Sequence, residues 1–113
     1  MNLRGKKFVL IGGAGLIGSH TAEELIKEDI KELVIFDNFF RGSMENIKDL
    51  LNSALKNTDG VFHFAALWLL QCHMYPRAAF KVNVEGMFNV LETCVKNNIK
   101  RLVWSSSASV YGD

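Results

Sequence analysis

A glycine cluster that directly follows a short apolar run is the feature that most constrains the fold of this chain. Residues 8–20 have the sequence FVLIGGAGLIGSH, and the apolar run breaks at Gly12. Beyond the glycines, the apolar spacing becomes that of one helix face, with Leu16, Ile17, Thr21 and Leu25. This change of period predicts a strand, a tight glycine turn and then a helix.

Each glycine of this turn fits the binding of a pyrophosphate. Gly12 stands where the chain must bend with a positive φ angle, Gly15 lets a phosphate approach the backbone, and Gly18 lets the helix lie against the strand. The helix N-terminus adds free N–H groups and a positive dipole end. The spacing fits G-x-x-G-x-x-G, or G-x-G-x-x-G when counted from Gly13. The predicted cofactor-binding residues of the turn are Gly12, Gly13, Ala14, Gly15, Leu16, Ile17 and Gly18.

An acidic residue follows the second predicted strand, which spans residues 33–36. Asp37 lies 19 positions after Gly18, close to the spacing at which dinucleotide-binding folds carry a ribose-binding acid. Its carboxylate accepts the hydroxyls of an adenosine ribose and repels a 2′-phosphate, which favours NAD over NADP. The alternative is that Asp37 only begins a turn with Asn38. The full succession of strand, glycines, helix, strand and acid favours dinucleotide binding.

The composition fits a single globular domain over residues 1–113. Hydrophobic residues make up 49% and charged residues 22%, and the net charge of +1 argues against a nucleic-acid partner. The basic and apolar start resembles a signal peptide, but glycines interrupt its apolar run, and dinucleotide binding explains them better. No stretch reaches the roughly 18 apolar residues of a membrane span. We therefore expect a cytoplasmic protein that does not contact a membrane.

The cysteines and histidines are not predicted to bind a metal. Cys72 and His73 show no paired ligand spacing with His63. In a cytoplasmic protein a disulfide between Cys72 and Cys94 is the less favoured state. Cys94 falls in an apolar helix face, where a small core residue is expected.

Strands and helices are predicted to alternate along the chain. Helices are expected over residues 16–28 and 44–56, and a third strand over residues 61–64. Ala65 and Ala66 then leave room for a ligand at the carboxyl end of this strand.

A long amphipathic helix is predicted to begin at Pro76 and to precede a fourth strand over residues 102–104. Asn83 lies off its apolar stripe, and the strand runs into a serine cluster at residues 105–107. The stripe consists of Phe80, Val84, Met87, Phe88, Leu91 and Val95.

Alternating strands and helices imply a parallel sheet with right-handed crossovers. With the first strand central, the strand order becomes 2-1-3-4. We therefore predict an α/β protein with a Rossmann-like three-layer αβα fold and a four-stranded parallel sheet of that order. The ligand crevice is expected above the first and third strands, beside Gly12 and Ala65.

Five motifs taken together resemble the NAD-dependent epimerase/dehydratase family of extended short-chain dehydrogenases/reductases: GGAGLIG, FDN, VFHFAA, VNVEGMFNVLE and RLVWSSSASVYGD. The resemblance covers essentially the whole chain. It implies NAD as the cofactor, with Asp37 and Asn38 at the adenosine ribose and Ala65 and Ala66 along the cofactor. It also implies that Asn83 supports the site from the long helix.

The same resemblance makes Ser107 the candidate catalytic hydroxyl, which would hydrogen-bond the sugar oxygen whose proton leaves. The base of the family is the tyrosine of a Tyr-x-x-x-Lys pair on a later helix. No such pair occurs in these 113 residues, because Tyr75 is followed four positions later by Ala79 and Tyr111 is nearly terminal. We therefore expect a truncated cofactor-binding part that binds a dinucleotide without turnover.

The interval between Asp37 and Val61 is short, with 23 residues. Family members usually carry a further strand in this interval, which ends in an acidic residue that contacts adenine. Its loss leaves the strand of residues 33–36 at an edge of the sheet, and an exposed edge invites pairing with another chain. We expect self-association through that edge or through apolar surface that the missing half normally covers.

The leading hypothesis is the NAD(H)-binding portion of a nucleotide-sugar epimerase or dehydratase. In that family NAD removes a hydride from a sugar carbon and returns it after epimerisation or elimination. A nucleotide sugar is therefore expected as partner only in a full-length relative. Two alternatives stay open: a non-catalytic nucleotide-binding module, and a folding-competent structural fragment with a vestigial cofactor site.

Overall fold

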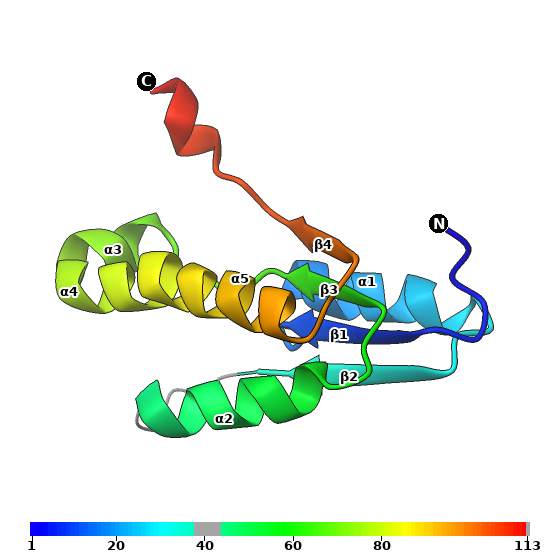
Figure 1. Cartoon of the computed structure of the whole chain (residues 1–113). Coiled ribbons are helices and arrows are strands. Elements are labelled where there is room, and N and C mark those ends of the chain that lie inside the picture. The colour runs from blue at the N-terminus through cyan, green and yellow to red at the C-terminus, as the bar shows by residue number, and fades with distance from the viewer. Residues whose placement is uncertain (38–43, 113) are drawn as a thin grey trace.

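The computed structural model describes residues 1–37 and 44–112, without the side chains of residues 44–48. One parallel sheet has the strand order β2-β1-β3-β4, so the predicted order is confirmed (Figure 1). At its carboxyl edge, Ile11 lies between Phe36 and His63 in the strand register. The strands are β1 (Lys7–Ile11), β2 (Glu32–Phe36), β3 (Gly60–His63) and β4 (Arg101–Trp104).

The predicted helices are present, and the structure adds a short helix, a π-helical segment and the 3-10 turn near residue 110. A short helix precedes Pro76 and was not predicted, because six residues are too few to show a helical period. The long helix contains a π-helical segment, η1, between two α-helical parts. The helical elements are α1 (Leu16–Ile26), α2 (Met44–Leu55), α3 (Leu69–Met74), α4 (Pro76–Ala79), η1 (Phe80–Glu85), α5 (Gly86–Lys96) and the 3-10 turn η2 (Ala108–Tyr111). No helix in the described ranges is long and apolar enough to cross a membrane.

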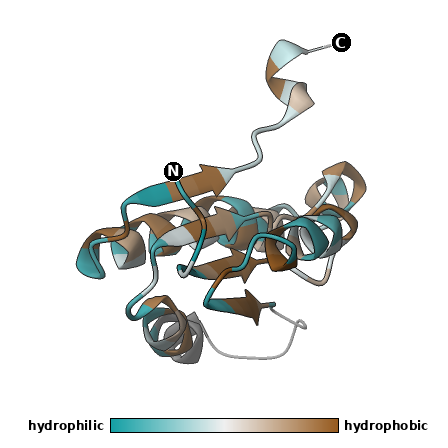
Figure 2. Cartoon of the chain, turned by 90° about the vertical axis from the view of Figure 1, so that its right-hand side faces the viewer, coloured by the Kyte–Doolittle hydropathy of each residue, from teal (hydrophilic) through white to brown (hydrophobic). Residues whose placement is uncertain are grey.

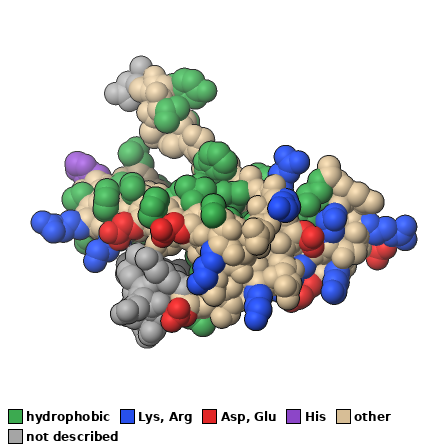
Figure 3. Space-filling view, in the orientation of Figure 1, with side chains coloured by type: hydrophobic (Ala, Val, Ile, Leu, Met, Phe, Trp, Pro, Cys, Tyr) green, Lys and Arg blue, Asp and Glu red, His purple; other side chains and the backbone are tan. Residues whose placement is uncertain are grey.

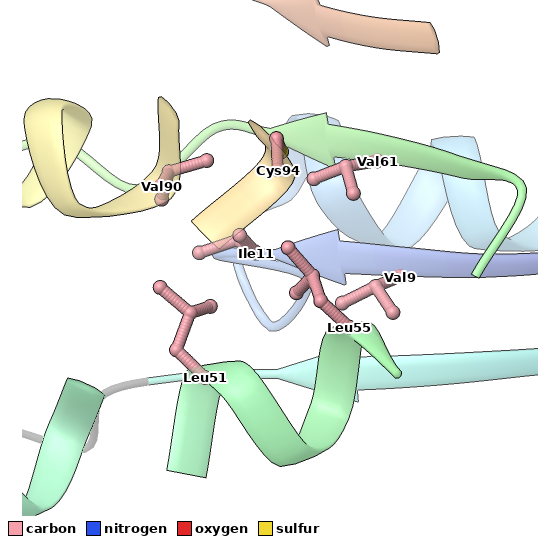
Figure 4. Close-up of a cluster of buried hydrophobic side chains, with 7 residues drawn as sticks. All are labelled: Val9, Ile11, Leu51, Leu55, Val61, Val90 and Cys94. Atoms are coloured by element: carbon pink, nitrogen blue, oxygen red, sulfur yellow. The ribbon is translucent and has the colours of Figure 1, made fainter. Parts of the chain in front are cut away.

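Helices cover both faces of the sheet, which gives the predicted three layers. Alternate side chains of β1 point to opposite faces, as the pleat of a strand requires. On one face Phe8 and Leu10 pack with Ala22 and Leu25 of α1. On the other face α2 and α5 pack over the sheet (Figure 4). The cluster there consists of Val9, Ile11, Leu51, Leu55, Val61, Val90 and Cys94. Hydrophobic residues accordingly dominate the strands (Figure 2).

The long helix turns its predicted apolar stripe outward. Phe88 is 60% exposed and Val95 is 79% exposed, and Phe80, Val84 and Leu91 are exposed with them. Hydrophobic side chains gather accordingly over the run from α3 to α5 (Figure 3). The side of α5 that packs on the protein carries Asn89, Val90, Thr93 and Cys94. The polar group of Thr93 is satisfied within the helix, because its Oγ1 atom donates to the Asn89 carbonyl at 2.7 Å. This side of the helix can therefore pack against the protein although it carries polar side chains.

Both edges of the described sheet are open. β2 forms one edge, as predicted, and β4 forms the other. Beyond β4 the chain leaves the body of the molecule and ends in the turn η2 (Figure 1), where Tyr111 is 89% exposed.

Candidate functional site

The glycine turn between β1 and α1 lies at the carboxyl edge of the sheet (Figure 1), and close packing fixes most of it. Gly12 has a φ angle of 81°, and a Cβ atom there would lie 2.5 Å from the backbone nitrogen of Ala65. A Cβ at Gly18 would lie 2.6 Å from the Gly12 carbonyl oxygen. A Cβ at Gly13 would lie 2.7 Å from Cγ2 of Ile35. These three glycines are therefore required by the fold itself.

Gly15 differs from the other glycines of the turn. The nearest atom to a Cβ built there is the Gly12 carbonyl oxygen at 3.6 Å, an ordinary van der Waals distance. Its φ of −78° and ψ of 173° suit any residue, and it caps α1 without a side-chain hydrogen bond. The first N–H groups of a helix have no partner within the helix. The described part of the fold therefore has room for a Cβ atom at position 15, and an anion bound at the N-terminus of α1 would explain the glycine.

Asp37 holds the glycine turn from the end of β2. Its Oδ2 atom accepts a hydrogen bond from the Ala14 backbone N–H at 2.9 Å. No hydrogen bond to its Oδ1 atom is found among residues 1–37 and 49–112. Asp37 thus makes a contact that shapes the glycine turn. Asn38, the other predicted ribose contact, lies outside the described residues.

Asn83 fixes the backbone that follows Ala65 and Ala66. Its Oδ1 atom accepts from the Leu67 N–H at 2.7 Å, and its Nδ2 group donates to the Leu67 carbonyl at 3.0 Å. The thiol of Cys72 also donates to the Leu67 carbonyl, at 3.2 Å, and accepts from Asn83 Nδ2 at 3.4 Å. Asn83 belongs to η1, and π-helical turns are frequent at functional sites. Sequence reasoning identified Asn83 but missed Cys72, because an isolated cysteine carries no spacing signal.

A cleft of about 590 Å³ brings this turn together with the serine cluster after β4. Ala65, Ala66, Asn83 and Ser107 are among the residues that line it. The Ser107 hydroxyl oxygen accepts from the Ser109 N–H at 3.2 Å, so its proton remains available to a ligand. The structure therefore places these four predicted residues at one cleft, whereas Asp37 does not line this cleft and contacts the glycine turn at Ala14.

A smaller cavity of about 100 Å³ lies between α2 and the run of η1 and α5. His63 lines it and is 7% exposed, and its Nδ1 atom has no hydrogen-bond partner among the described residues. Burial lowers the pKa of His63 below its usual value of 6.5. Sequence reasoning missed this residue, although strand alternation after Val61 predicts that His63 points to the same buried face.

The chain matches a known protein family along nearly its whole length. The model described as NAD dependent epimerase/dehydratase family matches residues 8–113. The bifunctional protein GAL10 of Candida maltosa is 38% identical, and the match covers 94% of this chain and 84% of that protein. The UDP-glucose 4-epimerase of Lactobacillus helveticus is 35% identical, and the match covers 94% of this chain and 37% of that enzyme.

Solved structures show the same fold in longer chains. The UDP-N-acetylglucosamine 4-epimerase of Methanobrevibacter ruminantium superposes with a TM-score of 0.83 at 33% identity, over 96% of this chain and 40% of that chain. The UDP-glucose 4-epimerase of Brucella ovis, solved in complex with NAD, superposes with a TM-score of 0.82 at 26% identity, over 96% of this chain and 38% of that chain. The chain thus spans about two fifths of the solved enzymes it matches.

The alignment with one relative is longer than the chain itself. The alignment with the Candida maltosa protein extends over 131 residues, although this chain has 113. An alignment longer than the chain requires that the chain lacks residues that its relative has. That the missing residues include the family's strand between Asp37 and Val61 stays a prediction.

Proposed function

The chain belongs to the NAD-dependent epimerase/dehydratase family, and on that premise we propose that it is the NAD(H)-binding part of a nucleotide-sugar epimerase. The room for a Cβ atom at Gly15 in the described part of the fold is the observation that carries this proposal. The fold explains the glycines at positions 12, 13 and 18 by close contacts, but it gives no reason for a glycine at position 15. A phosphate that approaches the backbone at the N-terminus of α1 supplies that reason.

The residues present fit a dinucleotide along the carboxyl edge of the sheet. In this proposal the pyrophosphate lies at Gly15 and the free N–H groups of α1, and an adenosine ribose hydroxyl donates to Asp37 Oδ1. The opposite half of the cofactor extends past Ala65 and Ala66, where Asn83 holds the backbone in place through Leu67. When bound, NAD supplies hydride transfer. The chain's own contribution is to bind the cofactor and to orient it toward the cleft.

The cleft beside Ser107 is the proposed entry point for a sugar. Relatives of this chain are named for UDP-glucose and UDP-N-acetylglucosamine, which supports a nucleotide sugar as the ligand of a full-length relative. Ser107 is proposed to hydrogen-bond the sugar hydroxyl that loses its proton. The 113 residues contain no Tyr-x-x-x-Lys pair to accept that proton. We therefore propose that this chain by itself binds NAD without turnover.

Calorimetric titration with NAD and NADP tests the proposal. We expect saturable NAD binding that is tighter than NADP binding, because the Asp37 carboxylate repels a 2′-phosphate. In Gly15→Ala the added methyl group occupies the space of the phosphate, and NAD binding should weaken at least about tenfold, or ~1.4 kcal/mol. In Asp37→Ala the preference for NAD over NADP should disappear.

Thr21→Ala is the matched control, because it also changes α1 but lies six residues after Gly15. This variant should bind NAD as the unmodified chain does. Circular dichroism of each variant establishes that it is folded. Absence of NAD binding in a folded sample, or equal binding by Gly15→Ala, would contradict the proposed function.

We also propose that the chain associates with a second copy of itself. Exposed apolar patches of this kind mark interaction sites, and the outward stripe of the long helix includes Phe88 and Val95. Analytical ultracentrifugation should give a dimer or larger species for the unmodified chain, and Phe88→Glu should shift it toward the monomer. Association that survives Phe88→Glu would indicate the open edge at β2 instead. A monomeric mass at high protein concentration would contradict both surfaces.

A further inference from the structure

Cys72 of α3 places a thiol in the wall of the cleft of about 590 Å³. The side chain is half-buried and its thiol is free. The thiol donates to the Leu67 carbonyl at 3.2 Å, but Asn83 Nδ2 donates to the same carbonyl at 3.0 Å, so the sulfur is not the sole support of this backbone. A molecule in the cleft can therefore reach a sulfur atom that the fold does not fully require.

Cys94 provides an internal comparison, because it is the other cysteine of the 113 residues and lies in the core. It is 7% exposed and packs with Val61 and Val90 (Figure 4). Burial raises the pKa of the Cys94 thiol, and the thiolate is the form of a cysteine that attacks a disulfide. A reagent that attacks only accessible thiols therefore distinguishes Cys72 from Cys94.

His63 gives the same cleft a buried polar group without a partner. The residue lines the cleft and is more than nine-tenths buried, and its Nδ1 atom has no hydrogen-bond partner in the described part of the chain. Along β3 its side chain points to the same face as Val61, which α5 covers and where Met87 of α5 also lines the cleft. Because buried polar atoms are nearly always paired, the unpaired Nδ1 atom indicates that a polar molecule or a water completes the cleft.

The remaining walls of the cleft suit a small peptide. Trp68 and Trp104 line it and are both more than half exposed, so their rings offer contact to methylene groups. The serine hydroxyls after β4 offer hydrogen bonds to peptide and carboxylate groups. Among the described residues that line the cleft none carries a carboxylate, so no fixed negative charge in the lining repels an acidic peptide. Asn83 Nδ2 also donates to the Cys72 sulfur at 3.4 Å, and such a bond strengthens when the sulfur is ionised.

We propose that Cys72 is a site of reversible thiolation by a small peptide disulfide, of which glutathione disulfide is an example, and that the attached peptide blocks the cleft. The Cys72 thiolate attacks one sulfur of the reagent, and a new S–S bond forms as the S–S bond of the reagent breaks. The Cys72 sulfur is oxidised, and the proton of its thiol passes to solvent. The departing sulfur is reduced and takes up a proton from solvent. His63 Nδ1 forms a hydrogen bond with a polar group of the attached peptide.

The effect of this modification on NAD binding rests on the proposed function, whereas the modification itself does not. Ala65 and Ala66 line the cleft together with Cys72, and half of the cofactor is proposed to extend past these alanines. A peptide attached to the sulfur occupies that space. It also replaces the hydrogen that binds the carbonyl of Leu67, the residue after Ala66. Thiolation and NAD binding therefore exclude each other.

Mass spectrometry after incubation with glutathione disulfide tests the site. Trypsin places the two cysteines on separate peptides, residues 57–77 with Cys72 and residues 82–96 with Cys94. In the folded chain we expect one glutathione on the Cys72 peptide, which dithiothreitol removes, and an unmodified Cys94 peptide. In urea both peptides should be modified, because unfolding exposes Cys94.

Tryptophan fluorescence reports on the cleft directly, because the chain's two tryptophans, Trp68 and Trp104, both line it. Thiolation should change the emission and dithiothreitol should restore it, whereas Cys72→Ser should show neither effect. In His63→Phe the reaction with glutathione disulfide should be about 3–10-fold slower, because one hydrogen bond is lost. The reaction with iodoacetamide, which measures only access to the sulfur, should keep its rate. Labelling of the unmodified chain decides the question even if His63→Phe does not fold.

Competition with NAD tests the consequence of the modification. At an NAD concentration about ten times its dissociation constant, thiolation of Cys72 should be about tenfold slower. The thiolated chain should bind NAD at least about tenfold more weakly than the untreated chain. Incubation of Cys72→Ser with glutathione disulfide should leave the NAD affinity of that variant unchanged.

The outcomes distinguish this inference from the proposed function. Absence of thiolation at Cys72, or equal thiolation of Cys72 and Cys94 in the folded chain, would overturn the site, while NAD binding that depends on Gly15 leaves the proposed function standing. Thiolation that leaves NAD binding unchanged would overturn the block of the cleft. Absence of NAD binding would overturn the proposed function, whereas selective thiolation of Cys72 that slows in His63→Phe would still support the site.

Discussion

Replacement of Gly12 by alanine is expected to lower the free energy of unfolding by about 2–4 kcal/mol, whereas the same replacement at Gly15 changes it by less than about 1 kcal/mol. Gly12 has a φ angle of 81°, where an alanine is strained, and its added Cβ would lie 2.5 Å from the Ala65 backbone nitrogen. At Gly15 the backbone is extended and the nearest atom is 3.6 Å away. Urea denaturation of the two variants and the unmodified chain measures both effects.

The contrast between these variants separates a glycine required by folding from one required by a ligand. If Gly12→Ala were as stable as the unmodified chain, the turn would not be in close contact with the backbone that follows β3. If Gly15→Ala were strongly destabilised, the glycine at position 15 would have a structural cause, and the main support for the proposed function would be lost. Each variant adds one methyl group to the chain, and the two positions are three residues apart. The two variants therefore provide close controls for each other.

Much of the fold follows from local sequence signals. The glycine turn after an apolar run, and the acid after the next one, are enough to predict two parallel strands joined by a helix. The parallel order follows because each strand is separated from the next by a helix, and crossovers between parallel strands are right-handed. These features are set by the backbone and by short-range periodicity, which is why the order β2-β1-β3-β4 could be predicted.

The orientation of the long helix could not be predicted in the same way. An amphipathic pattern indicates that one side of a helix is covered, but not whether the sheet or another chain covers it. In this protein Phe88 and Val95 face outward, and the packed side carries Asn89 and Thr93. Because the packed side carries polar side chains, the hydrophobic pattern of the sequence did not identify it as the buried side. The π-helical segment that places Asn83 at Leu67 also leaves no mark in a simple helical period.

The site was predictable where a motif fixes the backbone, and less so where side chains meet across the sheet. The turn residues and Asp37 are positioned by their own strands, so their sequence spacing was informative. The hydrogen bond from Ala14 to Asp37 joins residues 23 positions apart, and it depends on the register of β1 and β2. The cavity at His63 is formed by residues of α2, η1, α5 and three strands together. Such a meeting of distant elements has no local sequence signal.

The stability of the protein is expected to fall as the pH is lowered from 7 to 5, because His63 is buried in its neutral form. Burial lowers the pKa of His63 in the folded state, whereas in the unfolded chain it stays near 6.5. Above pH 6.5 both states hold His63 neutral, so its contribution to stability is fully present. Below pH 6.5 the unfolded state binds the proton first, and the free energy of unfolding declines by up to about 1.4 kcal/mol per pH unit until the folded-state pKa is reached.

Urea denaturation at pH 7, 6 and 5 measures this decline, and two phenylalanine variants identify its source. His63→Phe keeps an aromatic ring in the cavity but removes the titrating group, so its free energy of unfolding should depend less on pH over this range. His73→Phe makes the same change at an exposed residue of α3 and should retain the full dependence. Most carboxylates titrate below this window, so they contribute little to it. An equal pH dependence in both variants would show that the Nδ1 atom of His63 accepts a proton without cost, and therefore that water already reaches the cavity.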